Sequence, residues 1–386
     1  MLRRLTLGFV SLAAVGAFVA CSSGNTNPIS VGPNFPTASL YATNTSQNAI
    51  SIYLPGAASG SGPSNQIGGS STQIAGPQYL AFDTAGDLYI TNYAQSSGAS
   101  SVLVIKALAT GNVLPINQVT QVGHPRGIAV FSYPNAGSTP NPQLAVGNVN
   151  SNAGAGFNSQ VLLYNATVLG SPYTVIAGPA TGLNVPSGIA VDASDRLYVA
   201  NLQGASVEGF TLPTPAPTPV PTATPAATPT PTATPTANPS ASPSVGPSAT
   251  PLPTPTPLNL APTFTISGAA SGITTPTSVA IDGTGNIYVS DQGNPSVGIA
   301  PSILVFSAGL AGSVSPAPAR KISGSATLLL APTDVKVDGT GKIYVADSTT
   351  SGTGVVYVYA ATANGNVAPS ATLTSPGAIS GLALSP

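Results

Sequence analysis

Residues 275–291 read TPTSVAIDGTGNIYVSD, and this stretch decides the fold because close copies of it recur along the chain. The copies are GPQYLAFDTAGDLYITN from Gly76, VPSGIAVDASDRLYVAN from Val185 and APTDVKVDGTGKIYVAD from Ala331. Each copy has a proline, a short alternating apolar strand, a turn, and a second strand that ends in a small residue and Asn or Asp. This pattern predicts an antiparallel hairpin, and its repetition predicts an array of such units.

An aspartate opens the turn of each hairpin, and we expect these acids to be structural. A carboxylate at this position can accept hydrogen bonds from the turn amides, and a glycine three residues later tolerates a positive φ. The copy from Val185 lacks this glycine. The predicted turn acids are Asp83, Asp192, Asp282 and Asp338.

Two further units are less regular. The segment HPRGIAVFSYPNAGSTPNPQLAVGN from His124 is a copy whose turn is enlarged and has lost the aspartate. The chain ends in ISGLALSP, which matches a first strand, and the missing second strand, SLYATN, stands near the other end at Ser39 to Asn44. Pairing of these two segments would close a ring and remove exposed sheet edges.

Each unit continues with two more strands. The third strands read AISIYL, SVLVI, QVLLY, SVEGFTL, SILVF and VVYVY. The fourth is introduced by a repeated phrase, GNVLPINQVTQVG at 111, GSVSPAPARKISG at 312 and GNVAPSATLTS at 365. The units begin at Pro77, Pro125, Pro186, Pro276 and Pro332, and the split unit makes six. The sequence therefore predicts an all-β fold, a six-bladed β-propeller of four-stranded antiparallel blades closed by pairing of the C-terminal strand with the N-terminal strand.

Residues 213–257 interrupt blade four. They hold sixteen prolines and no charged residue, a composition that favours polyproline II and cannot form a packed core. SVEGFTL before the block is a third strand without its fourth, and NLAPTFTISG after it is a fourth strand without its third. We therefore predict a disordered insertion within a propeller that spans 39–386. The alternative is two domains, 39–212 and 258–386, joined by a stalk.

The N-terminus, MLRRLTLGFVSLAAVGAFVAC, has the layout of an export signal, and its apolar run is too short to span a bilayer. The ending FVAC resembles the lipobox of bacterial lipoproteins, although Phe18 departs from the usual leucine. That resemblance implies a signal peptide over 1–20, a lipidated Cys21 and a flexible tether over 21–38. We expect an exported protein in the bacterial cell envelope, at the outer membrane or cell surface, that contacts membrane only through its lipid. Simple secretion and a retained anchor are the alternatives.

Composition limits the partners. Cys21 is the only cysteine, so the mature fold can hold no internal disulfide and no thiolate metal site. Removing Arg3 and Arg4 with the signal leaves seven Lys and Arg against ten Asp and Glu, a net charge near −3. Nothing here attracts nucleic acid or an anionic membrane electrostatically, and we expect a monomer.

The consensus P-x-x-I-A-V-D-x-x-G-x-I-Y-V-A-D resembles the NHL repeat from residue 39 to the end, the insertion excepted. The resemblance implies a six-bladed propeller that acts as a binding platform, although some relatives are lyases or lactonase-like hydrolases. It also implies that the turns between first and second strands lie on one face and the blade-to-blade connections on the other. The second face, usually the one that binds ligands, would carry Asn44, Gln78, Asn92, His124, Arg126, Asn148, Asn201, Asp291, Asp334 and Asp347.

Catalytic residues are scarce. His124 is the only histidine, so a zinc or copper site built from several histidines is excluded, and no G-x-S-x-G motif surrounds a serine. Lactonase-like relatives hold a divalent cation with carboxylates and an asparagine. The only glutamate, Glu208, is on a third strand, which leaves Asp291 and Asp347 as weak candidates for a hard cation. Residues of this type at strand ends ordinarily cap turns, so we predict neither a metal nor a cofactor.

Three hypotheses follow. The leading one is a lipid-anchored, non-catalytic scaffold that binds an unknown protein, peptide or glycan on the second face. The second is a hydrolase or lyase that uses a hard cation there. The third is a structural surface protein whose Pro/Thr loop is O-glycosylated.

Membrane attachment through Cys21 can be tested by replacing the lipid acceptor. Cys21→Ser should move the protein from the membrane fraction to a soluble fraction, because the mature chain would lose its lipid anchor. Fractionation followed by mass spectrometry of the N-terminus measures this. A wild-type protein that is already soluble and begins downstream of Cys21 would contradict the prediction.

Overall fold

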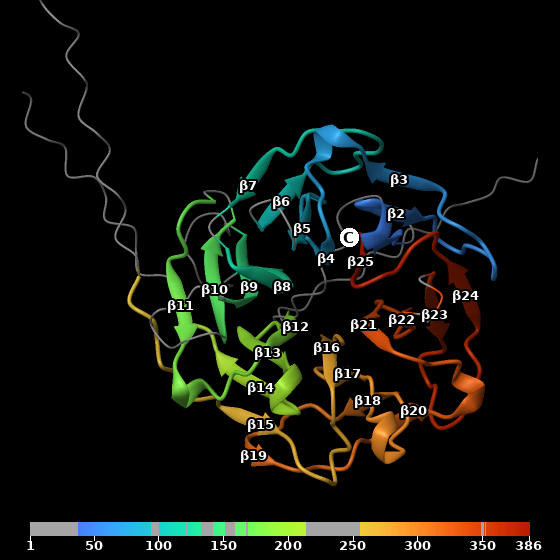
Figure 1. Cartoon of the computed structure of the whole chain (residues 1–386). Helices are drawn as coiled ribbons and strands as arrows, with labels where there is room; N and C mark the ends of the chain where they lie inside the picture. The colour runs from blue at the N-terminus through green and yellow to red at the C-terminus, as the bar shows by residue number, and fades with distance from the viewer. Residues whose placement is uncertain are drawn as a thin grey trace, which may run out of the picture.

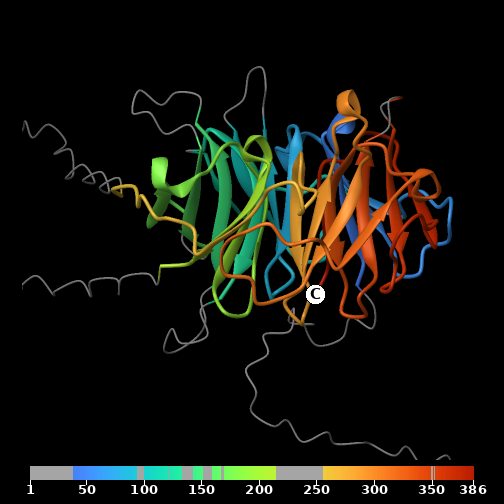
Figure 2. The same cartoon turned by 90° about the horizontal axis from the view of Figure 1, so that it is seen from below.

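The computed structural model describes residues 38–93, 100–120, 122–132, 142–150, 159–166, 169–213, 255–348, 351 and 353–386. Figure 1 shows six sheets around a central axis, and Figure 2 shows that together they form a flat disc. The predicted six-bladed all-β propeller is confirmed. Within the described ranges, no helix is long and apolar enough to cross a membrane.

The strands of each blade follow one another from the axis to the rim (Figure 1). Blade one holds β25 (Leu382–Leu384), β1 (Leu40–Asn44), β2 (Ala49–Tyr53) and β3 (Asn65–Gly68). Blade two holds β4 (Pro77–Phe82), β5 (Leu88–Asn92), β6 (Ser101–Ile105) and β7 (Asn117–Val119). Blade three holds β8 (His124–Phe131), β9 (Gln143–Val149), β10 (Ser159–Asn165) and β11 (Thr174–Ala177).

The second half of the disc repeats this order. Blade four holds β12 (Pro186–Val191), β13 (Arg196–Asn201), β14 (Ser206–Thr211) and β15 (Phe264–Ile266), to which β19 (Gly312–Val314) is added. Blade five holds β16 (Pro276–Ile281), β17 (Ile287–Asp291), β18 (Ser302–Phe306) and β20 (Arg320–Ser323). Blade six holds β21 (Pro332–Val337), β22 (Ile343–Ser348), β23 (Gly354–Tyr359) and β24 (Ala371–Thr374). The connections carry the short 3₁₀ helices η1 (Thr45–Gln47), η2 (Ser70–Thr72), η3 (Pro179–Thr181), η4 (Leu202–Gly204), η5 (Pro295–Val297) and η6 (Ser325–Thr327).

The two ends of the described chain close the ring, as predicted. β25 pairs antiparallel with β1, with Leu384 opposite Leu40 and Leu382 opposite Ala42. The Oγ1 atom of Thr43 accepts hydrogen bonds from the backbone N–H groups of Ser380 and Gly381, at 2.8 and 2.9 Å. The innermost strand of blade one is therefore supplied by the C-terminus.

Blade four joins strands that are far apart in the sequence. β14 pairs antiparallel with β15, with Val207 opposite Ile266 and Gly209 opposite Phe264. The segments on either side of the Pro/Thr block therefore share one sheet. Residues 214–254, which make up most of that block, lie outside the described residues, as do the predicted signal peptide, Cys21 and almost all of the tether.

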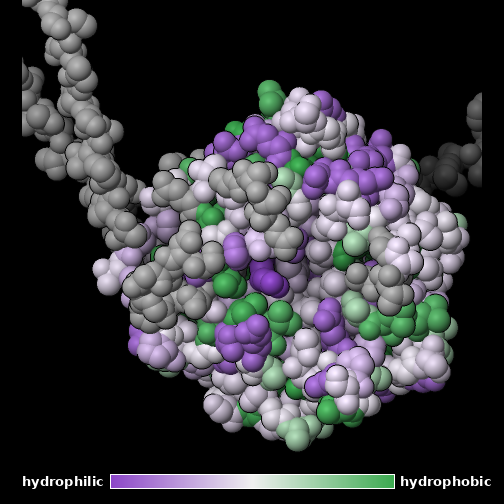
Figure 3. Space-filling model, in the orientation of Figure 1, coloured by the Kyte–Doolittle hydropathy of each residue, from purple (hydrophilic) through white to green (hydrophobic). Residues whose placement is uncertain are grey.

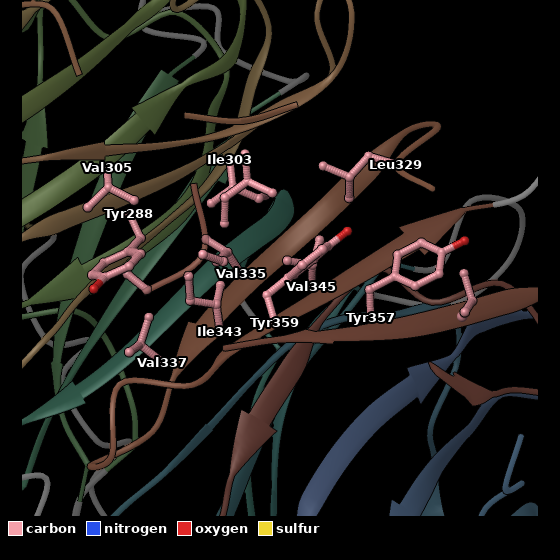
Figure 4. Packing of buried hydrophobic residues seen from close by; sticks show 14 residues of the cluster. Tyr288, Ile303, Val305, Leu329, Val335, Val337, Ile343, Val345, Tyr357 and Tyr359 are labelled. Atoms are coloured by element: carbon pink, nitrogen blue, oxygen red, sulfur yellow. The ribbon is translucent and has the colours of Figure 1, made fainter. Parts of the chain in front are cut away.

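The core lies between the blades. Alternate residues of each strand face one neighbour or the other, and both faces are apolar because both are covered. Figure 4 shows one such layer, in which Val335 and Val345 of blade six pack with Ile303, Val305 and Tyr288 of blade five. Burying each aliphatic side chain of this size contributes about 1.5–3 kcal/mol.

The repeated phrase that introduces each fourth strand also pairs with the preceding blade, which the sequence did not predict. We expected it to turn the chain into the outer strand of its own blade, but its first residues pair in parallel with the outer strand of the preceding blade. β19 lies beside β15 in this way, and single bridges join Ile67 to Gly111 and Ile322 to Gly365. In blade five the outer strand proper, β20, begins only at Arg320. An outer strand has an unpaired edge, and the next blade covers part of it.

Removing residues 379–386 should test the ring closure. The deletion would expose the edge of β1 and remove the buried side chains of Ile379 and Leu382, so we expect aggregation or a loss of at least about 3 kcal/mol in the free energy of unfolding. Urea unfolding of a chain that starts at residue 22, with and without 379–386, measures this. Removal of 22–37 is the control and should leave the midpoint unchanged. Equal midpoints with and without 379–386 would contradict the closure.

Candidate functional site

Tyr79 crosses the centre of the disc. It belongs to β4 of blade two and is 6% exposed. Its hydroxyl donates to the carbonyl oxygen of Thr277 (2.8 Å) on the opposite blade, and lies 3.1 Å from Ser187 Oγ and 3.3 Å from the carbonyl oxygen of Thr333. One side chain thus links blade two with blades four, five and six and closes the axis. Burial raises the pKa of Tyr79, and the nearby charge of Asp334 raises it further.

The innermost strands approach one another too closely for side chains of ordinary size. The position of Tyr79 is occupied in the other blades by Gly127, Gly188, Ser278, Asp334 and Gly381. A Cβ atom on Gly127 would lie 2.0 Å from the carbonyl oxygen of Ser187, and one on Gly188 would lie 2.3 Å from Ser278 Oγ. Glycine is required here by close backbone approach, which leaves room for one large residue.

Asp334 is completely buried beside this plug, and its charge is compensated within the protein. Lys336 Nζ lies 2.7 Å from its Oδ1 atom and 2.9 Å from its Oδ2 atom. The hydroxyl of Ser278 and the backbone N–H of Leu382 also donate to it, at 2.5 and 2.7 Å. The carboxylate therefore joins blades five, six and one. A buried charge of this kind requires such partners.

Arg126 follows Pro125 at the start of β8 and is partly buried. Among the residues that the structure describes, its guanidinium has no hydrogen-bond or ion-pair partner. Its positive charge acts on the hydroxyl of Tyr79, where it opposes the rise in the pKa. Arg126 directly precedes Gly127, which occupies the position of Tyr79 in blade three, so Arg126 stands at the mouth of the axis, on the side of the tyrosine plug where the inner strands begin. Figure 3 views the disc along its axis and shows strongly hydrophilic residues near the centre.

Two more predicted face residues open neighbouring inner strands. Gln78, next to Tyr79, is partly buried and donates through Nε2 to the carbonyl oxygen of Gly76 (3.2 Å). The ring of His124 packs edge-on against Tyr93, with 4.6 Å between the ring centroids. Gln78 occupies in blade two the position that Arg126 occupies in blade three, and His124 stands two residues before Arg126 in β8, so amide and aromatic groups lie on the same face as Arg126.

The asparagines that end the second strands are buried, and Asn92 and Asn201 hydrogen-bond the loops that lead from blade to blade. Asn92 accepts from the backbone N–H of Ala75 (3.2 Å) and donates to the carbonyl oxygen of Gln73 (2.8 Å). Asn201 makes the equivalent pair of bonds, and Asn44 caps η1. Asn148 differs, because its buried Oδ1 atom has no hydrogen-bond partner in the described part of the chain.

The two acids proposed as weak cation ligands occupy the same structural position. Asp291 accepts hydrogen bonds from the backbone N–H groups of Thr274 (2.7 Å), Thr275 (2.9 Å) and Gly293 (2.8 Å). Asp347 accepts from the N–H groups of Leu330 and Ala331, at 2.9 and 2.8 Å. Both carboxylates are fully buried and hold backbone loops. Across the described residues, no group of three or more His, Cys, Asp or Glu is arranged to hold a metal ion.

The turn acids lie on the opposite face and fold back onto their own hairpins. Asp83 Oδ1 accepts from the N–H groups of Ala85 and Asp87, both at 2.9 Å. Its Oδ2 atom accepts from Tyr89, and Asp192, Asp282 and Asp338 accept from Tyr198, Tyr288 and Tyr344 in the same way. Burial and the neighbouring Asp338 raise the pKa of Tyr344 to about 12. The sequence analysis did not predict these hydrogen bonds, although the constant spacing of six residues between aspartate and tyrosine was a signal for them.

A second repeated signal was also missed. GSST, GPAT, GAAS and GSAT follow the outer strands of blades one, three, four and five, beginning at Gly69, Gly178, Gly268 and Gly324. In each, the last hydroxyl donates to the carbonyl oxygen of the glycine, and in three of them the next blade supplies a capping asparagine. For example, Asn112 Oδ1 accepts from Ser71 N (2.8 Å), and a Cβ on Gly69 would lie 2.6 Å from that amide oxygen.

No family model matches the chain, and no curated protein matches it, so membership of the NHL family stays a prediction. Among solved structures, a protein of unknown function from Bacteroides caccae is 11% identical with a TM-score of 0.52, over 90% of this chain and 99% of that one. A putative 6-phosphogluconolactonase from Bacteroides uniformis is 10% identical with a TM-score of 0.46, over 87% and 82%. A PQQ-bound aldose sugar dehydrogenase from Streptomyces coelicolor is 13% identical with a TM-score of 0.44, over 80% and 82%. At these identities the first likeness shows the propeller fold alone, and the other two support no functional argument.

Tyr79→Phe should destabilise the protein while keeping the ring in place. The substitution leaves the hydroxyl of Ser187 and the carbonyl oxygen of Thr277 without this partner, and we expect a loss of about 1–3 kcal/mol in the free energy of unfolding. Tyr93→Phe is the matched control, since Tyr93 is partly exposed and its hydroxyl makes no hydrogen bond among the described residues. Urea unfolding measures both variants. Equal midpoints for the two would show that the axial hydrogen bonds contribute nothing.

Proposed function

We propose that the protein is a non-catalytic binding scaffold, anchored by a lipid on Cys21 in the cell envelope. Its ligand, a protein, peptide or glycan, binds the face that carries the blade-to-blade loops and the mouth of the axis. The observation that carries this proposal is the state of the acids on that face, since Asp291, Asp334 and Asp347 are buried and hydrogen-bonded within the protein.

This observation favours binding over cation-dependent hydrolysis. A hard cation needs several oxygen ligands, and on this face it would have to displace backbone N–H groups from Asp291 or Asp347. Those N–H groups would then be buried without partners, at a cost of about 1–3 kcal/mol each. A hydrogen-bonding ligand needs no such change, because it can bind the side chains of Arg126, Gln78 and His124 at the mouth of the axis.

The closed ring suits a scaffold. Hydrogen bonds of Tyr79 and Asp334 link strands of five of the six blades across the axis, so the loops are presented on a rigid support. A preformed site reduces the ordering cost of binding. The proposed O-glycosylation of the Pro/Thr block is compatible with this role and stays a prediction.

The face can be tested by blocking it. Because Cys21 is the only cysteine, Cys21→Ser allows a single thiol to be placed at will. Val297→Cys puts it on η5, at an exposed position on the proposed face, and Lys342→Cys puts it in an exposed turn on the opposite face. A polyethylene glycol maleimide on residue 297 should abolish binding to the ligands found on glycan and peptide arrays, and the same group on residue 342 should not.

A calcium titration distinguishes the scaffold from the cation-dependent hydrolase. Calcium titration by calorimetry should show no tight stoichiometric site. Tight calcium binding, together with calcium-dependent hydrolysis of a lactone, would support the hydrolase instead. An array that yields no ligand, or ligands blocked equally from both faces, would also contradict the scaffold proposal.

A further inference from the structure

We infer that the mouth of the axis is a site for a singly charged oxyanion, a carboxylate of the bound ligand, with Arg126 as its anchor. The inference rests on the proposed function and names the chemistry of the ligand. Lys336 is paired with Asp334, whereas the guanidinium of Arg126 has no partner among the residues that the structure describes. One positive charge is therefore uncompensated.

The backbone around Arg126 is held firmly. Pro125 restricts φ on one side. On the other side, Gly127 is pressed against blade four, where a Cβ would meet the carbonyl oxygen of Ser187. The mouth also has a floor, because the buried ring of Tyr79 spans the axis and its hydroxyl is already bound to the opposite blade. A ligand group at the mouth therefore meets Arg126 and stops above Tyr79.

The single positive charge of Arg126 favours a ligand group with one negative charge. A carboxylate carries one negative charge at neutral pH and matches the planar fork of a guanidinium through two parallel hydrogen bonds. A phosphate monoester carries about 1.5–2 negative charges, and the second would have no cation to pair with, because Lys336 is already paired with Asp334. The amide of Gln78 and the Tyr93–His124 ring pair lie on the same face, at the starts of the inner strands of blades two and three, and are suited to the neutral part of such a ligand.

Two pairs of probes test the charge and identify its source. D-galacturonate is compared with D-galactose, and N-acetyl-alanyl-alanine is compared with its C-terminal amide, each titrated by calorimetry or NMR. In at least one pair the acid should bind about tenfold or more tightly than its neutral partner, as expected for a charge-assisted hydrogen bond. The pair that shows the preference distinguishes a sugar acid from a peptide terminus.

Variants then assign the effect to Arg126. Arg126→Gln should remove the preference for the acid, and Arg126→Lys should retain part of it, because the charge remains but the planar fork is lost. Lys342→Gln is the matched control, which removes one positive charge from an exposed turn on the opposite face and should leave the preference unchanged. Circular dichroism checks that each variant is folded.

Three outcomes would overturn the inference: equal binding of acid and neutral partner, an unchanged preference in folded Arg126→Gln, or stronger competition by inorganic phosphate than by acetate. Failure here is distinguishable from failure of the scaffold proposal. If array ligands are blocked by the group on residue 297 but bind Arg126→Gln as they bind wild type, the scaffold stands and only the carboxylate site is wrong.

Discussion

The pairing of β25 with β1 is the contact on which the rest of the structure depends. Each blade is apolar on both faces and cannot remain in water with either face open. Only a closed ring covers all twelve faces of six sheets, and the ring is closed by a strand contributed from the other end of the chain. The buried Asp334 reinforces the same contact, because one of its oxygens accepts from the backbone of Leu382 in β25.

Closure of the ring brings the inner strands so close together that the size of the side chain in one blade limits the size that the other blades can accept. Three of the six blades have glycine at the level of Tyr79, and a Cβ at Gly127 or Gly188 would collide with the neighbouring strand. Tyr79 fills the space that remains and satisfies its hydroxyl on three other blades. The axis is thereby a packed and hydrogen-bonded core, and the proposed binding face begins above it.

Polar residues near that surface look alike in the sequence, but only some of them have side chains that are not already hydrogen-bonded within the described part of the protein. Asp291 and Asp347 are acids at the ends of strands, yet they act as acceptors for backbone N–H groups of the blade-to-blade loops. Arg126 lies near the start of the inner strand β8, and it has no counter-ion among the residues that the structure describes. A face whose acids are used internally and whose free charge is a guanidinium is suited to binding an anionic group. It is poorly suited to holding a hard cation.

The sequence by itself determined the units and their number. An alternating apolar pattern, an Asp-x-x-Gly turn and a final Asn or Asp are local features, and their repetition indicated six blades and the joining of residues 379–386 to Ser39–Asn44. Tertiary structure alone decided which polar side chains are used for hydrogen bonds within the protein. Whether Asp291 binds a ligand or a loop depends on the N–H groups of Thr274 and Thr275, which its own strand does not reveal. The position of Tyr79 across the axis, the Asp334–Lys336 pair and the pairing of β19 with blade four were likewise not predictable. Each depends on where segments from different blades converge, and sequence periodicity describes only the neighbours along one chain.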